Sequence, residues 1–113
     1  MMGAVTNETV LFSGEIGTQR VRVWLEWQGD DLQLLSHDIG PGLERFFGED
    51  EIETFLTVKA DQLPELARAL GCPSEPTSIQ AALMDRYRDD AAATTHLRAF
   101  LEDAGIPYDF FLT

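Results

Sequence analysis

The sequence is poor in positively charged residues. It has 8 lysines and arginines against 20 aspartates and glutamates, a net charge of −12 over 113 residues. Because phosphate binding needs a basic surface, the composition argues against direct contact with nucleic acid, and an anionic membrane surface is disfavoured for the same reason. A basic protein partner or a cation is electrostatically compatible with the chain. Acidity also serves simply to keep a small domain in solution.

Cysteine and long apolar runs are scarce as well. The single cysteine, Cys72, excludes an internal disulfide, and no apolar run approaches the roughly 20 residues of a membrane-spanning helix. The opening residues, MMGAVTNETV, have neither the basic nor the apolar segment of a signal peptide. These features predict a cytoplasmic protein, and the length predicts one domain over residues 1–113.

The acidic residues are concentrated in one quarter of the chain. From Glu26 to Glu53 there are nine of them and a single base, Arg45, which leaves that stretch at −8. Such an asymmetry predicts a surface with a directed negative field.

The first half of the chain alternates with the period of two that is typical of strands. The pattern is clearest from Gln19 to Gln28, where β-branched and aromatic residues dominate. The Gly29-Asp30-Asp31 turn predicts an antiparallel connection to the next strand. The predicted strands cover residues 9–15, 19–28, 32–36 and 51–59.

The second half has helical periodicity. Asp61 is the predicted N-cap of a first helix that ends at Gly71, and Thr77 with Gln80 is a predicted capping box for the next. The apolar positions of residues 78–104 fit either one bent helix or two. We favour two, because the Asp89-Asp90 pair suits the start of a new helix.

The order of strands before helices predicts an α+β fold. An antiparallel sheet of about four strands in the N-terminal half is expected to carry two to three C-terminal helices. The apolar tail from Tyr108 to Leu112 is expected to dock on this body as an edge strand.

An acidic cluster and a neighbouring histidine are the candidates for chemistry. The cluster is Glu49, Asp50, Glu51 and Glu53. On a strand, Glu51 and Glu53 share a face about 7 Å apart, which suits a solvated face, a partner-binding surface or a metal ion. His37-Asp38 could ligate a metal or act as a base, but neighbours on a strand point to opposite faces.

Other catalytic patterns are missing from the sequence. It has no nucleophile elbow and no phosphate-binding glycine loop. His96 has no carboxylate four residues away, and Cys72 follows a helix C-terminus, where the dipole disfavours a thiolate. We therefore interpret Cys72 as structural.

Trp24 and Phe55 lie on the polar sides of their strands. If the two strands are close, one sheet face carries both aromatics among charged residues. That face is either a second layer under the helices, which three helices in need of packing favour, or an exposed recognition patch.

Residues 37–70, HDIGPGLERFFGEDEIETFLTVKADQLPELARAL, combine an Asp-aliphatic-Gly, a Gly-acid-acid stretch, an alternating strand and a leucine-rich helix. This pattern resembles one found in small uncharacterised bacterial proteins, a domain of unknown function. The resemblance implies a bacterial protein. In size and charge the chain is similar to immunity and antitoxin proteins, which neutralise basic toxins.

These observations together predict a non-enzymatic domain that binds a basic protein and needs no cofactor, and a homodimer is compatible with them. The predicted contact residues are Trp24, Phe47, Glu49, Asp50, Glu51, Glu53 and Phe55. One alternative is a small metal-binding domain or metal-dependent enzyme that uses His37, Asp38 and the Glu49 to Glu53 region. Another is a self-associating structural protein whose tail seals a dimer.

Overall fold

A five-stranded sheet and a layer of helices make up the computed structural model, which describes residues 8–41 and 50–113. The elements are β1 (Thr9–Ile16), β2 (Gln19–Gln28), β3 (Asp31–Ile39), β4 (Glu51–Val58), a 3-10 turn η1 (Ala60–Gln62), α2 (Leu63–Leu70), α3 (Pro76–Tyr87), α4 (Ala93–Ala104) and β5 (Asp109–Leu112). The predicted α+β fold is confirmed. The sheet has one more strand than the N-terminal half supplies, because the tail returns as β5.

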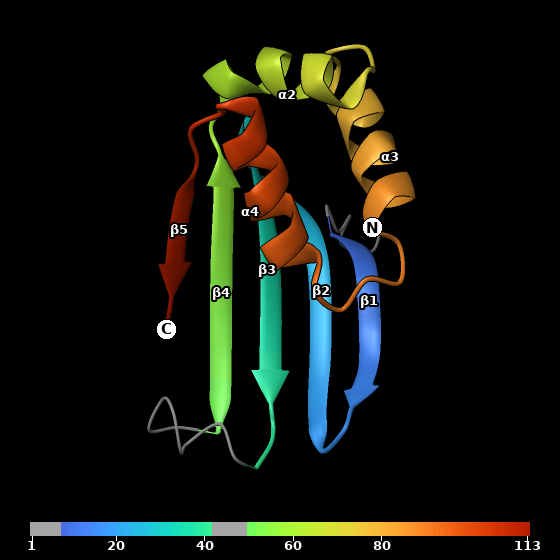
Figure 1. Cartoon of the computed structure of the whole chain (residues 1–113), viewed down its shortest axis with the longest axis vertical. Helices are drawn as coiled ribbons and strands as arrows, with labels where there is room; N and C mark the ends of the chain where they lie inside the picture. The colour runs from blue at the N-terminus through green and yellow to red at the C-terminus, as the bar shows by residue number, and fades with distance from the viewer. Residues whose placement is uncertain (1–7, 42–49) are drawn as a thin grey trace, which may run out of the picture.

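The strands follow one another across the sheet in chain order, and each pair is antiparallel. β5 arrives after the helices and lies beside β4, on the edge of the sheet opposite β1 (Figure 1). The predicted edge strand is therefore confirmed. β3 runs three residues past its predicted end because β2 and β4 pair with it over its whole length.

The helices cover one face of the sheet and bury one core. In Figure 1, α4 lies in front of the strands, α2 crosses their upper end, and α3 runs from α2 down to the start of β1. The molecule measures 22 Å along its shortest axis, as expected for one helical layer on one sheet. The fully buried side chains of this core include Val23, Leu25, Leu34, Leu56, Leu66, Ile79, Leu83, Leu97 and Leu101.

The N-terminus of α2 is not capped as predicted. Asp61 lies inside η1, and the residue that precedes α2 is Gln62, which makes no capping hydrogen bond through its side chain. The carboxylate that serves this corner comes from Asp31, whose Oδ1 accepts the N–H of Ala60 at 2.8 Å. The predicted C-terminus is correct, since Gly71 ends α2 in the left-handed conformation at φ 74°.

The predicted capping box of α3 is wrong as well. The helix begins two residues earlier than the box implies, at Pro76, whose fixed φ suits the first helical position. Gln80 bonds elsewhere: its Oε1 accepts from Trp27 Nε1 at 2.8 Å, and its Nε2 donates to Thr9 Oγ1 at 2.9 Å. The side chain that would have served a local cap instead fastens α3 to β1 and β2.

Residues 78–104 belong to two helices, as predicted. Between α3 and α4, Asp89 adopts φ 63° and donates its N–H to the carbonyl of Leu11 at 2.8 Å. The chain thus leaves α3 to contact β1 before α4 begins.

Gly40 marks a close approach of backbones where β3 ends. A Cβ atom at this position would lie 2.9 Å from both the Gln19 Cα and the Thr18 carbonyl oxygen. Since backbone atoms must shift to relieve such contacts, Gly40→Ala is expected to lower the free energy of unfolding by about 1–3 kcal/mol. Urea unfolding measures this change. Gly71→Ala would have no atom within 4 Å to displace, so the two variants separate steric crowding from the strain of a left-handed residue.

Candidate functional site

The sheet face opposite the helices, called the open face here, carries an apolar row with one residue from each strand. Trp24 pairs in register with Val10 on one side and Leu35 on the other, Leu35 pairs with Phe55, and Phe55 with Phe111. None of these five belongs to the core beneath the helices. The row therefore crosses the full width of the sheet on the side that no described helix covers.

Exposure rises toward the ends of this apolar row. Leu35 at its centre is 7% exposed, whereas Val10 and Phe111 at the two edges are 40% and 59% exposed. The Phe55 and Phe111 rings are in contact, with centroids 5.8 Å apart. An apolar row that crosses a whole sheet and is bordered by polar residues is typical of a surface that contacts another protein.

Trp24 is held in place by its charged neighbours. The Arg22 guanidinium lies 4.3 Å from the centre of the indole ring, and Trp24 Nε1 donates to Glu26 Oε1 at 3.2 Å. Arg22 also forms an ion pair with Glu8, with Nη2 and Oε1 2.8 Å apart. A fixed, half-buried indole loses little conformational freedom on binding, which suits an anchor residue.

Carboxylates of the strands gather on the open face. By the alternation of the strands they are Glu15, Glu26, Asp31, Glu51, Glu53 and Asp109. Arg20 and Arg22 are the strand arginines of this face. Of the acids within the described strands, only Asp38 points toward the helices. The open face is therefore both apolar along its centre and acidic around it.

The predicted contact residues are distributed as follows. Trp24, Phe55, Glu51 and Glu53 lie together on the open face. Asp50 is exposed just before β4, and its carbonyl oxygen accepts the N–H of Gly40 at 2.9 Å. Phe47 and Glu49 lie outside the described residues.

Three residues of the apolar row were not predicted. Leu35 follows Leu34 directly, so only the register of β3 shows which of the two faces the helices. Phe111 and Val10 belong to the two edge strands, and their place in the row depends on pairings that no local pattern specifies. The predicted second layer over Trp24 and Phe55 is not present among the described elements, because the helices pack on the other face.

His37 and Asp38 point to opposite faces of the sheet. His37 Nε2 lies 2.7 Å from Glu51 Oε1 on the open face. Asp38 points toward α4 and lines a cavity there. Across residues 8–41 and 50–113, no three His, Cys, Asp or Glu side chains cluster as metal ligands do.

The helix-facing position of Asp38 has a consequence for stability. Burial raises the pKa of its carboxyl group, against the smaller opposing effect of His37. The folded protein thus holds this proton more tightly than the unfolded chain, so the ionised group destabilises the fold at every pH above the raised pKa.

Asp38→Asn is therefore expected to raise the free energy of unfolding at neutral pH. The gain over the unsubstituted protein should be absent below pH 3.8 and should grow as the pH rises through the raised pKa. Urea unfolding of both proteins across this range measures it. A gain that is independent of pH would contradict the assignment.

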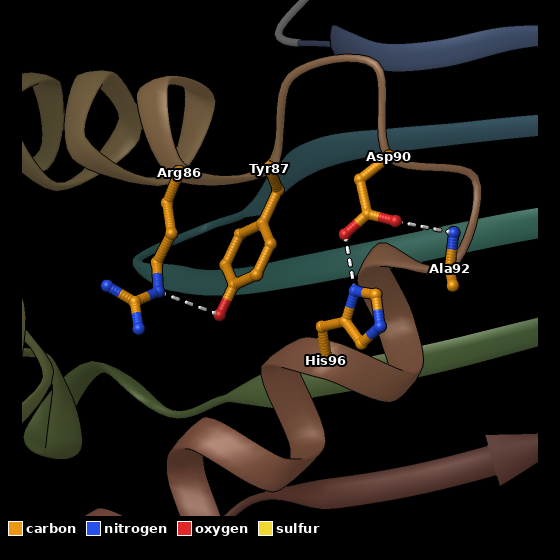
Figure 2. A network of polar contacts seen from close by, with 5 residues as sticks. All are labelled: Arg86, Tyr87, Asp90, Ala92 and His96. Carbon is orange, nitrogen blue, oxygen red and sulfur yellow. Dashed lines mark hydrogen bonds and ion pairs between the residues drawn. The ribbon is translucent and has the colours of Figure 1, made fainter.

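Polar contacts also order the segment between α3 and α4. Figure 2 shows Asp90 between the two helices, where Oδ2 lies 2.6 Å from His96 Nδ1 and Oδ1 accepts the N–H of Ala92 at 2.9 Å. Arg86 Nε donates to the hydroxyl of Tyr87 at 3.3 Å, while burial raises the pKa of Tyr87. His96 thus has a carboxylate partner six residues away. The arrangement fixes the start of α4.

Comparison with known proteins found no matching family model, no matching curated protein and no matching solved structure. In the described part of the chain, none of the helices has the length and apolar character needed to cross a membrane.

Proposed function

We propose that this protein is a non-enzymatic binding module whose open face engages a basic protein, in the way that immunity and antitoxin proteins engage basic toxins. The observation that carries the proposal is the apolar row framed by carboxylates. Trp24 and Phe55 would anchor the partner, and Glu51 and Glu53 would steer it. The resemblance of residues 37–70 supports a bacterial, cytoplasmic setting.

The dimensions of the open face suit this role. The five strands have 8, 10, 9, 8 and 4 residues, and at about 3.3 Å per residue and about 4.8 Å between strands they cover roughly 600 Å² in projection. A standard protein interface removes about 800 Å² of accessible surface from each partner. The open face alone is thus close to the size of a specific interface.

Charge favours a different protein over a second copy of this chain. Two open faces brought together would place six strand carboxylates against six others, with two arginines on each side. Such like-charge contact is costly, whereas lysines and arginines on a partner would pair with the same carboxylates. The open face therefore favours a basic heterologous partner.

The steering role is tested by Glu51→Gln with Glu53→Gln. At low salt, the double variant should bind the partner about tenfold more slowly, with a weaker dependence on ionic strength, because the attractive field is reduced. Surface plasmon resonance with the basic protein recovered from native cell extract measures the rate.

Asp85→Asn with Asp103→Asn is the matched control, since it removes the same charge from exposed positions of α3 and α4. The proposal predicts that this control keeps most of the association rate. Equal losses in both double variants would show that only the net charge matters and would contradict steering by the open face.

A further inference from the structure

The helix-facing side of the sheet changes character along β3 and β4. Near α2, the inward positions are Leu34, Leu56 and Val58, each about 1% exposed. Farther along the same side they become Ser36, Thr54 and Asp38. The period of a strand places apolar residues at such inward positions, as it does again at Ile52 opposite Asp38. A polar group of two successive inward residues on β3 and one on β4 is therefore not explained by the fold.

These three polar residues line a cavity of about 260 Å³ between the sheet and the start of α4. Thr94 and Arg98 line it from α4, and Phe110 lines it from β5. At about 30 Å³ for each water molecule, the volume corresponds to roughly nine waters, which is the size of a small organic molecule.

The cavity contains two opposite charges that do not pair with each other. Among the described residues, Asp38 forms no ion pair and no side-chain hydrogen bond. The Arg98 guanidinium stacks on Phe110, 3.9 Å from the ring centre, and its Nε donates to the Tyr108 hydroxyl at 3.3 Å. Arg98 is thus positioned by aromatic contacts, with its terminal nitrogens left for another group.

A buried hydroxyl in the same cavity also lacks a partner. Thr94 Oγ1 is shielded from solvent and has no hydrogen-bond partner in the part of the chain described. Ser36 and Thr54, by contrast, share a hydrogen bond between their hydroxyls. An unsatisfied buried polar atom costs free energy, and in native proteins it commonly marks a group that a ligand or water completes.

We propose that this cavity binds a small zwitterion of the α-amino acid class. Its ammonium group would contact Asp38, its carboxylate would contact Arg98, and a further polar atom would reach Thr94 Oγ1. A simple anion would face the Asp38 carboxylate, and a simple amine would leave Arg98 without a counter-charge. A ligand with both charges satisfies both residues.

The probes are the standard L-amino acids, each at about 10 mM, with methylammonium and acetate as single-charge controls. At least one amino acid should raise the melting temperature, because a ligand of the native state alone stabilises it. In a ¹H–¹⁵N NMR titration, the same amino acid should shift the backbone amides of Thr94 and Thr95. Neither methylammonium nor acetate should raise the melting temperature or shift these amides to the same extent.

Two variants locate the binding. Asp38→Asn and Arg98→Gln should each weaken the NMR-derived affinity about tenfold or more, since each removes a charge-assisted contact. Asp85→Asn and Arg68→Gln, on exposed parts of α3 and α2, should leave it unchanged. If Arg98→Gln does not fold, Asp38→Asn is sufficient to test the site. An amino acid that binds Asp38→Asn equally well, or the failure of every probe to bind, would overturn the proposal.

Discussion

Alanine at Trp24 is expected to weaken binding of the basic partner about 30-fold, the largest loss we expect from any single change on the open face. Central, half-buried aromatics of an interface commonly contribute 2 kcal/mol or more, and that energy corresponds to this factor. Phe55→Ala, in the neighbouring part of the apolar row, should cost a similar amount. Isothermal titration calorimetry with the recovered partner measures both affinities.

Phe100→Ala is the control for these aromatic substitutions. Phe100 is also half-buried, but it packs on the helical layer beneath Arg86, whose guanidinium lies 4.3 Å from its ring centre. The Phe100→Ala variant should bind the partner with an affinity within about twofold of that of the unsubstituted protein. Phe111→Ser adds a test that does not depend on folding, because Phe111 is 59% exposed at the sheet edge. Full affinity in both Trp24→Ala and Phe111→Ser would contradict the proposed interface.

Leu34→Ala is expected to cost about 3 kcal/mol of folding free energy, whereas Leu35→Ala should cost about half as much. Leu34 is 1% exposed within the core, so its removal leaves a closed cavity. Leu35 is nearly as buried, at 7%, but it lies on the open face, where solvent can fill the space left behind. Urea unfolding measures both values.

These two adjacent leucines test the assignment of the sheet faces. The stability loss at Leu34 would be a large part of the 5–15 kcal/mol that holds an ordinary domain together. The effects on binding should be reversed: Leu35→Ala should weaken the partner complex, and Leu34→Ala, if folded, should not. A larger stability loss at Leu35 than at Leu34 would contradict the placement of the core.

Periodicity was sufficient to predict the four N-terminal strands, although not the end of β3. Apolar and polar residues alternate from Gln19 to Gln28 because one side of the strand is buried and the other is not. The observed β2 has the bounds that this alternation predicts. Glu51–Val58 also alternates as predicted, with Ile52, Leu56 and Val58 buried. The tail was identifiable as an edge strand because it is short, apolar and follows a helix-ending glycine.

The N-termini of α2 and α3 could not be predicted from their own residues, unlike the C-terminus of α2 at Gly71. The carboxylate that serves the start of η1 comes from Asp31, 29 residues earlier, and Gln80 bonds with Trp27, 53 residues away. These contacts exist only once the sheet and helices are assembled. A side chain that matches a local capping pattern is then used for a tertiary contact.

The candidate site could be predicted only in part, because some of its residues stand out locally and others are identified only by the strand pairing. Trp24 and Phe55 stood out locally because each is an aromatic residue on the polar side of its strand. Their neighbour Leu35 is indistinguishable from a core leucine until the register is known. Likewise, the cavity at Asp38 depends on α4, which packs against β3 from more than fifty residues farther along the chain.

The central claim is that the open face binds a basic protein, and one affinity capture from native cell extract tests it most directly. The bait would be the unsubstituted protein, the Trp24→Ala and Phe55→Ala double variant, and Phe100→Ala, each at low and at high salt. We predict that the unsubstituted protein and Phe100→Ala recover the same basic protein at low salt. High salt should reduce the recovery, and the double variant should lose it. Recovery of that protein by the double variant at the level of Phe100→Ala would contradict the claim.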